Sequence, residues 1–160
     1  MTLDPEQLRR AMRAWSSGVT IVTAAHNGDR YGMTVGSFTS VSLEPPLIII
    51  SLHTESRTRQ LVSASGAFAV NILAEDQSGL SDRFAGRLAK ELDRFEGLET
   101  ETLVTGAPIL KSALASLDCR VQQVIPVGMN TLFLAEVVAA RGDGEGRPLL
   151  YHNRRYGHFS

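Results

Sequence analysis

The pattern of apolar and polar positions along the chain predicts a structure made mostly of β-strands. Several segments are rich in β-branched residues, which suit the pleated surface of a sheet. The segment 47–52 is almost continuously apolar, as is typical of a strand buried on both faces. Segments 116–127 and 131–140 predict two long strands joined at Gly128-Met129-Asn130. The expected strands are 19–23, 31–35, 38–43, 47–52, 68–73, 116–127, 131–140 and a short one at 149–151.

Helical signals are fewer and shorter. Residues 4–7 (Asp-Pro-Glu-Gln) carry an N-cap, a proline at the first helical position and a reciprocal capping residue. Leu8, Met12 and Trp15 then fall on one face of the predicted helix. The other expected helices are 54–65, with Leu61 and Val62 facing inward, 74–84, and a short helix or turn at 108–117, with a mobile charged segment at 85–97.

These elements predict an all-β architecture with helices at its periphery. The Asn27-Gly28 pair between two strand patterns indicates a tight hairpin. About six or seven strands without regular strand–helix alternation favour a closed antiparallel barrel with helices packed outside. We expect residues 1–160 to form a single domain.

Composition narrows the classes of function. The formal net charge of the 160-residue chain is −1, with 16 basic and 17 acidic residues, so no general field attracts nucleic acid or an anionic membrane. The single cysteine excludes an intrachain disulfide. The apolar run 47–50 is too short to span a bilayer, and residues 1–6 do not resemble a signal peptide. We therefore expect a cytoplasmic protein, and no metal site, because the four histidines lack ligand spacing.

Small polar residues gather between positions 32 and 59. Glycines at 32 and 36 would let a ligand approach the backbone, and the serines and threonines from 34 to 42 could bond its polar edge. The alternative is a strand whose hydroxyl groups are simply solvated. Residues 54–59 (Thr-Glu-Ser-Arg-Thr-Arg) lie at an expected helix start, where free N–H groups and arginines could bind a phosphate. Ordinary helix capping with a solvated basic face explains this segment equally well.

An ordered set of short motifs resembles the short-chain flavin reductase family. The motifs are Gly-Val-Thr-Ile-Val-Thr at 18–23, Gly-Met-Thr at 32–34, Ser-Phe-Thr-Ser-Val-Ser at 37–42, Pro-Pro at 45–46, Phe-Ala-Val-Asn-Ile-Leu at 68–73, Gln77, Phe84 and Pro-Leu-Leu-Tyr at 148–151. The resemblance extends from about Leu8 to Tyr156. It implies a homodimeric, FMN-binding split β-barrel, which binds FMN or FAD and reduces it with NADH or NADPH. It also implies that a partner monooxygenase receives the reduced flavin.

The same resemblance assigns cofactor-binding residues by position. Thr34, Val35, Gly36 and Ser37 would follow the isoalloxazine ring, and Ser40 and Val41 would meet its pyrimidine edge. The remaining assignments are Ser51 and Leu52 beside the ring and ribityl chain, Ser56, Arg57 and Thr58 at the phosphate, Phe84 and Gly86 in a covering loop, and Tyr156 from the C-terminus. The family's usual Gly-Asp-His turn, associated with the nicotinamide nucleotide, reads Gly128-Met129-Asn130 here. Asn130 keeps a hydrogen-bonding group, but the imidazole is absent.

Direct hydride transfer between two stacked rings needs no catalytic acid or base, so we expect no catalytic side chain. Three alternatives remain open. The altered turn would suit a flavin-binding sensor or carrier with little reductase activity. Another split-barrel oxidoreductase, such as a pyridoxamine phosphate oxidase-like or haem-handling protein, and a barrel used only for protein association are the other two.

Overall fold

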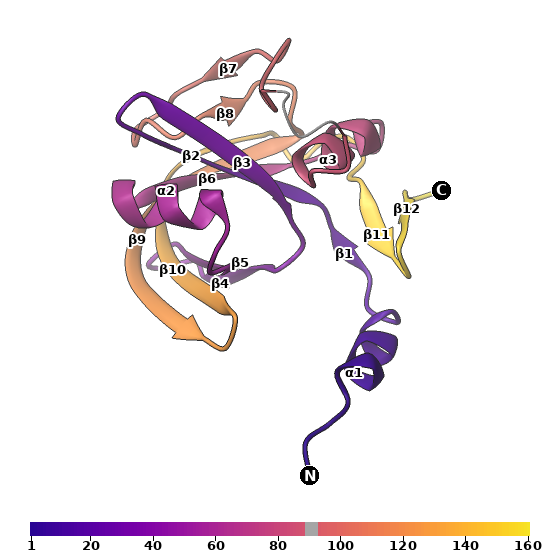
Figure 1. Ribbon diagram of the computed structural model, residues 1–160. Helices are drawn as coiled ribbons and strands as arrows, with labels where there is room; N and C mark the ends of the chain where they lie inside the picture. The colour runs from indigo at the N-terminus through magenta and orange to yellow at the C-terminus, as the bar shows by residue number, and fades with distance from the viewer. Residues whose placement is uncertain (89–92) are drawn as a thin grey trace.

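The computed structural model describes residues 1–88 and 93–160, and it is dominated by β-strands (Figure 1). Its elements in chain order are α1 (Pro5–Met12), β1 (Ser17–Gly18), β2 (Thr20–His26), β3 (Asp29–Val35), β4 (Phe38–Ser42), β5 (Leu47–His53), α2 (Arg57–Ser65), β6 (Ala67–Ile72), α3 (Ser78–Phe84), β7 (Thr100–Glu101), β8 (Ile109–Leu110), β9 (Ala115–Val127), β10 (Asn130–Arg141), β11 (Leu150–His152) and β12 (Arg155–Gly157). The prediction of a mainly β protein with peripheral helices is confirmed.

A seven-stranded antiparallel sheet in the order β3-β2-β6-β9-β10-β5-β4 forms the body of the protein. Its central strands β9 and β10 form the predicted long hairpin, with register shifts at Leu134/Ala135 and Val137/Ala139. Such irregularities increase local twist and bend a strand. The sheet curves around a core (Figure 1), and β1, β11 and β12 form a smaller sheet at one side of it.

The predicted hairpin turn is present between β2 and β3. Asn27 and Gly28 have φ values of 52° and 82°, the left-handed conformation that a two-residue turn of this kind requires. His26 pairs with Asp29 directly beside the turn. Local sequence therefore sets the register of β2 against β3, which places the end of β3 at the site described below.

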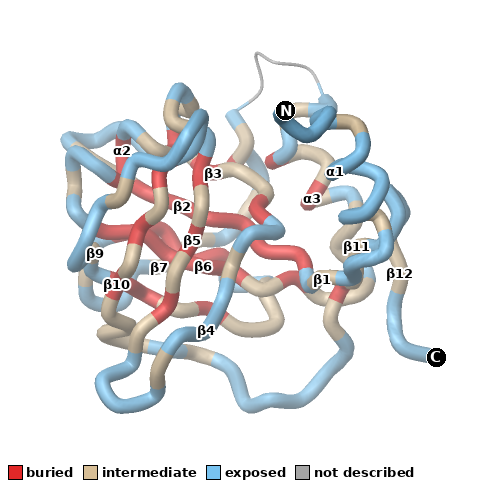
Figure 2. The backbone as a smooth tube through the Cα atoms, turned by 90° about the horizontal axis from the view of Figure 1, so that it is seen from below, coloured by how far each residue is buried: buried red, intermediate tan, exposed pale blue. Residues whose placement is uncertain are grey.

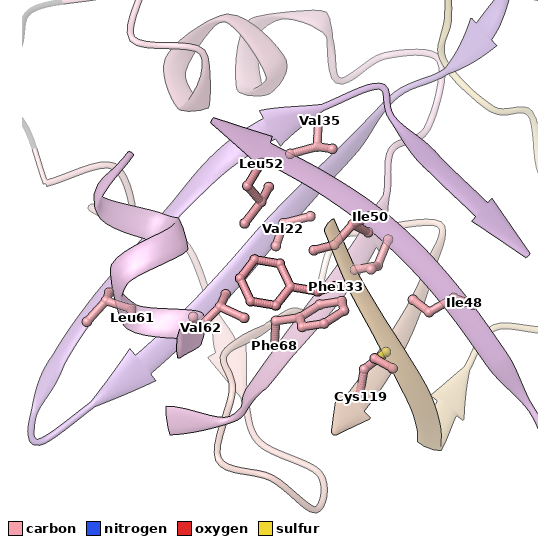
Figure 3. Packing of buried hydrophobic residues seen from close by; sticks show 13 residues of the cluster. Val22, Val35, Ile48, Ile50, Leu52, Leu61, Val62, Phe68, Cys119 and Phe133 are labelled. Carbon is pink, nitrogen blue, oxygen red and sulfur yellow. The ribbon is translucent and has the colours of Figure 1, made fainter. Parts of the chain in front are cut away.

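Side chains from the sheet and α2 fill the barrel interior (Figure 3). Phe68 and Phe133 lie at its centre, fully buried, and Leu61 and Val62 reach them from α2 as predicted. Cys119 is also fully buried, and burial raises the pKa of its thiol to about 12. The thiol therefore remains protonated at neutral pH, which suits a small core residue rather than a nucleophile.

The first helix differs from the rest of the fold because none of its residues is buried. Leu8 and Met12 lie on α1 and Trp15 lies beyond its end, and the three are 54%, 54% and 70% exposed. Figure 1 shows α1 projecting from the body beside β1, and Figure 2 shows the buried residues gathered along the strands of the large sheet instead. The pattern predicted a helix that is present but ends at Met12, before Trp15, and none of its residues is buried in the core of this chain.

The prediction of a helix or turn at 108–117 is only partly right, because residues 111–112 form a turn but strands lie on both sides of it. Residues 109–110 form β8, which pairs with β7, and β9 begins at Ala115. An apolar run this short is compatible with a buried strand and with a helix. Here the pairing with β7 makes it a strand. Three helices are shorter than expected: α1 ends at Met12, α2 begins at Arg57 and α3 begins at Ser78. Part of the charged segment 85–97 lies outside the described residues. Among the helices that are described, none has the length and apolar character needed to cross a membrane.

Candidate functional site

A groove follows the end of β3 from the start of α2 to the small sheet. Four neighbouring cavities make up this groove, with volumes of about 360, 230, 480 and 470 Å³. Thr34 and Ala85 line both of the first two cavities, and Gly36 lines the last three. Clefts that bind small molecules have volumes of this order.

The end of the groove next to α2 is positively charged. The guanidinium carbons of Arg57 and Arg94 lie 4.6 and 4.5 Å from the centroid of the Tyr31 ring. Arg57 also pairs with Asp29, and both partners are about half exposed. Arg94 donates to the carbonyl oxygens of Gly32 and Phe84, each at 2.9 Å, so its position is fixed by backbone. Two cations therefore flank this cavity, whose wall also includes Ser56.

Thr58 supplies a buried polar group without a partner in this cavity. The residue is fully buried, and its Oγ1 makes no hydrogen bond within the described part of the chain. It lies in the first turn of α2, where Ser56 is the N-cap and its Oγ accepts from the Arg59 N–H at 3.2 Å. A buried hydroxyl without a partner costs about 1–3 kcal/mol, which an anionic ligand could recover. The helix N-terminus adds free N–H groups and positive potential.

Small residues line the middle of the groove. The Thr34 Oγ1 donates to the Ser81 carbonyl oxygen at 2.6 Å, and this bond ties β3 to α3. A Cβ at Gly32 would lie 3.0 Å from the Phe84 ring, so glycine here allows α3 to approach β3 closely. Ser37 and Ser51 bond each other through the Ser37 hydroxyl and the backbone, at 3.0 and 3.1 Å. The groove floor is consequently backbone and small hydroxyl groups.

Tyr156 closes the side of the groove formed by the small sheet. Its hydroxyl lies 2.9 Å from the Ser81 Oγ and 2.7 Å from the Asp82 carboxylate. Burial, together with the hydrogen bond to Asp82, raises the pKa of Tyr156. The hydroxyl therefore stays protonated and donates, which anchors the C-terminal segment to α3. The Tyr151 ring lies 5.4 Å from the Tyr156 ring, and both line the 230 Å³ cavity.

The structure brings together only part of the predicted site. Of the predicted residues, those that line the four cavities are Thr34, Gly36, Ser37, Ser56, Arg57, Thr58, Phe84 and Tyr156. The side chains of Val35 and Leu52 point into the core, at 4% and 1% exposure, so only their backbone can face a ligand. Ser51 bonds Ser37 at the groove floor without lining a cavity itself.

The other predicted residues lie further away. Ser40 and Val41 are exposed on β4, an edge strand of the sheet. Gly86 follows α3 and has a φ of 74°. It lies so close to the Arg94 guanidinium that a Cβ at this position would be 3.0 Å from it. Asn130 is exposed at the start of β10. Its turn reaches the start of α2, because the Thr54 N–H donates to the Met129 carbonyl oxygen at 3.0 Å.

The lining residues that the sequence did not predict include Trp15, Tyr31, Tyr151 and Arg94. The sequence pattern placed Tyr31 and Tyr151 in ordinary strands, and it placed Trp15 on the apolar face of a helix. Arg94 belongs to a charged segment whose pattern indicates only a solvated loop. Its role depends on contacts with Gly32 and Phe84, which are 62 and 10 residues away in the sequence.

Comparison with known proteins identifies the family. The family described as "Flavin reductase like domain" matches residues 12–160. The chain belongs to this flavin reductase-like family. The predicted family and its split-barrel fold class are thereby confirmed.

Members of the flavin reductase-like family resemble this chain over nearly its whole length. It is 40% identical to the reductase component of the 4-nitrophenol 4-monooxygenase/4-nitrocatechol 2-monooxygenase of Rhodococcus opacus, covering 98% of this chain and 82% of that protein. It is 38% identical to the FMN reductase (NADH) RutF of Ancylobacter novellus, covering 96% and 84%. The structure of the Streptomyces globisporus NADH:FAD oxidoreductase SgcE6 with NAD and FAD fragments superposes with a TM-score of 0.89, at 32% identity, and covers 100% of this chain and 97% of that one. The predicted class, an NAD(P)H:flavin oxidoreductase, is confirmed at the level of the family.

Proposed function

We propose that this chain transfers a hydride from NADH or NADPH to FMN or FAD bound in the groove along β3, and supplies reduced flavin to a partner monooxygenase. The observation that carries the proposal is the Thr58 hydroxyl, buried without a partner in a cavity flanked by Arg57 and Arg94. A terminal phosphate is the ligand that such a cradle suits best, because it accepts from hydroxyl, amide and guanidinium donors together. The oxidoreductases named above support the proposal.

The groove provides different chemistry at its two ends. At the α2 end, Ser56, Arg57, Thr58 and Arg94 would hold the phosphate, and the first turn of α2 would add backbone donors. Towards the small sheet, the backbone of residues 34–37 and the hydroxyl of Ser37 would face the ring's polar edge. Val35 and Leu52 would act through backbone alone, because their side chains complete the core.

The protein's part in the reaction is to position two rings and exclude other geometries. The bound flavin supplies the hydride-accepting chemistry, so no residue of this chain needs to take or give a proton in that step. Ring separations of about 3–3.5 Å are required for such a transfer. Backbone N–H groups in the groove would stabilise the negative charge that develops on the reduced ring.

The direct test is turnover by the purified protein. NADH or NADPH is mixed with FMN or FAD, and nucleotide oxidation is followed by absorbance against the same mixture without protein. We expect saturable oxidation well above that background. Flavin binding without turnover would contradict the proposal and favour a sensor or carrier. Absence of flavin binding, or a haem spectrum in the purified protein, would favour the remaining alternatives.

A variant of Arg57 tests where the phosphate lies. Arg57→Gln should raise the Kd for FMN about tenfold, since one charge-assisted hydrogen bond is lost, and should leave the Kd for riboflavin unchanged. Arg120→Gln is the matched control, because Arg120 is exposed on β9 and lines none of the four cavities. Equal effects on FMN and riboflavin would contradict the phosphate assignment.

The chain would act as a single domain in a cytoplasmic homodimer. Exposed apolar side chains on the β9–β10 hairpin support association, because exposed apolar surface marks interaction sites. Asn130 would take the place of the family's usual histidine near the nicotinamide, using its amide to bond the carboxamide group.

A further inference from the structure

A second positively charged cavity lies at the other end of the groove, between α1 and the β11–β12 hairpin. Its volume is about 470 Å³, and Arg9, Arg13 and Arg154 contribute to its wall. It shares Ser17, Gly36 and Ser37 with the adjoining 480 Å³ cavity, so it is continuous with the groove proposed for the flavin ring. The phosphate end described above lies beyond Thr34, towards α2.

The charges around this cavity do not balance within the described residues. Glu6 pairs with both Arg9 and Arg13, at 3.3 and 3.4 Å, so one carboxylate serves two guanidinium groups. Arg154 forms no ion pair in the part of the chain that the structure describes. The Arg13 Nε is buried and finds no acceptor there either. An unpaired buried donor and an excess of positive charge both favour an anionic ligand.

The backbone holds Arg154 in an unfavourable conformation. Asn153 and Arg154 form the turn between β11 and β12, with φ values of 49° and 64°. Glycine is preferred at the second position of such a turn, and a residue with a Cβ costs about 1 kcal/mol or more there. Glycine at position 154 would give a more stable hairpin. Arginine lowers that stability but places a guanidinium group at the cavity wall.

Two aromatic side chains complete the cavity. Trp15 is 70% exposed and lines both this cavity and its 480 Å³ neighbour, and Tyr151 of β11 also lines this cavity. A heteroaromatic base stacks favourably on an indole face, by about 1–3 kcal/mol per base. Aromatic rings beside arginines thus offer both kinds of contact that a nucleoside diphosphate makes.

We propose that this cavity, which we call the α1 cavity, binds the adenosine diphosphate portion of the nicotinamide dinucleotide that donates the hydride. The diphosphate lies against Arg13 and Arg154, and adenine stacks on Trp15, so the rest of the dinucleotide extends towards Gly36 and Ser37. This inference rests on the proposed function. NADH and NADPH both carry this ADP group at the end remote from the nicotinamide, whereas the ADP group of FAD begins at the flavin phosphate, which the proposed function places at the α2 end of the groove.

Trp15 is the single tryptophan of the chain and therefore reports on the cavity directly. Fluorescence is excited at the red edge of the indole band, where ADP does not absorb, and ADP is titrated into the protein. We expect saturable quenching. Arg154→Gln should raise the Kd for ADP about tenfold, while Arg155→Gln, one residue along on β12 and outside the cavity lining, should leave it unchanged. No quenching by ADP, or equal effects of the two variants, would overturn the proposal.

Kinetics then identify the source of the ADP group. With FMN as acceptor, a rise in KM for NADH but not for reduced nicotinamide mononucleotide in Arg154→Gln assigns the α1 cavity to the hydride donor. A rise in KM for FAD but not for FMN would instead place the ADP group of the flavin here, and would overturn the assignment to the hydride donor. Unchanged KM values for both dinucleotides would contradict the proposal even if ADP binds. Because the ADP titration needs no turnover, failure of the proposed reductase function would be seen separately.

Discussion

Two fully buried threonines show how the same side chain serves opposite purposes. Thr23 donates to the Pro108 carbonyl oxygen and accepts from the Asn71 amide at 3.1 Å. Thr58 is equally buried, but its hydroxyl has no partner in the described chain and borders the α2 end of the groove. Thr23 therefore stabilises the fold, whereas Thr58 carries an energetic cost that a ligand can remove.

Replacing each threonine by the isosteric valine should have opposite effects. Thr23→Val should lower the free energy of unfolding by about 2–3 kcal/mol, because two buried partners lose their hydrogen bonds. Thr58→Val should raise it by about 1 kcal/mol and weaken FMN binding about tenfold without affecting riboflavin. Urea unfolding and flavin titration measure the two quantities. A loss of stability in Thr58→Val would show that the hydroxyl is already satisfied.

The buried Cys119 predicts a pH dependence of stability. Its pKa rises from 9.0 to about 12 on folding, mainly through burial. Between these values the unfolded chain releases the thiol proton while the folded chain retains it, so stability falls as pH increases. From pH 8 to pH 10 the wild type should lose about 1.4 kcal/mol more than Cys119→Ala does. Urea unfolding at both pH values measures this difference, and equal losses would contradict the prediction. The two proteins are compared by how much the free energy of unfolding changes with pH. Any pH-independent loss of stability caused by the alanine substitution therefore cancels.

At the scale of elements, Asn71 joins four strands through one side chain. Its amide nitrogen donates to the Ile21 carbonyl oxygen at 3.0 Å as well as to Thr23, both on β2. Its amide oxygen accepts from the Leu110 N–H at 2.9 Å and the Ser116 hydroxyl at 3.0 Å, on β8 and β9. Asn71 itself lies on β6. These bonds secure the short strand β8, which has little pairing of its own.

Asn71→Ala should therefore be among the most destabilising polar substitutions. We expect a loss of about 3 kcal/mol or more in the free energy of unfolding, because several buried groups are left without partners at once. Asn130→Ala, at an exposed position, should change stability by less than about 0.5 kcal/mol. Thermal or urea unfolding compares the two, and similar effects would contradict the importance of the Asn71 network.

At the scale of the molecule, apolar side chains remain exposed away from the groove. The exposed set on the β9–β10 hairpin is Val124, Val127 and Met129. A hairpin this long with an apolar exposed end suits an interface better than a free surface.

We expect the protein to be a homodimer whose interface includes the end of this hairpin. Val127→Glu should shift the protein towards monomer by placing a charge in an apolar contact, measured by analytical ultracentrifugation across a range of concentrations. Gln122→Glu is the control, because it adds the same charge to β9 further from the end of the hairpin. A wild-type monomer, or a dimer insensitive to Val127→Glu, would contradict this assignment.

The sequence alone determined the elements that depend on local chemistry. The Asn27-Gly28 turn, the N-cap of α1 at Asp4 and the long hairpin of β9 and β10 follow from residues close together in the chain, because turn geometry and side-chain periodicity are local properties. The ordered motifs from residue 18 to 151 also identified the family correctly. The prediction for 108–117 missed the strand β8, because a short apolar run does not distinguish a strand from a helix.

Tertiary structure decided which of the predicted residues face the groove. It turned the side chains of Val35 and Leu52 into the core, and it brought Arg94 to Tyr31 and Arg154 to Trp15. These arrangements depend on how a curved sheet closes and on which distant segments then meet, neither of which local sequence encodes. The unpartnered hydroxyl of Thr58 was likewise visible only after folding, because the absence of a hydrogen bond is a property of the whole surroundings and not of the residue.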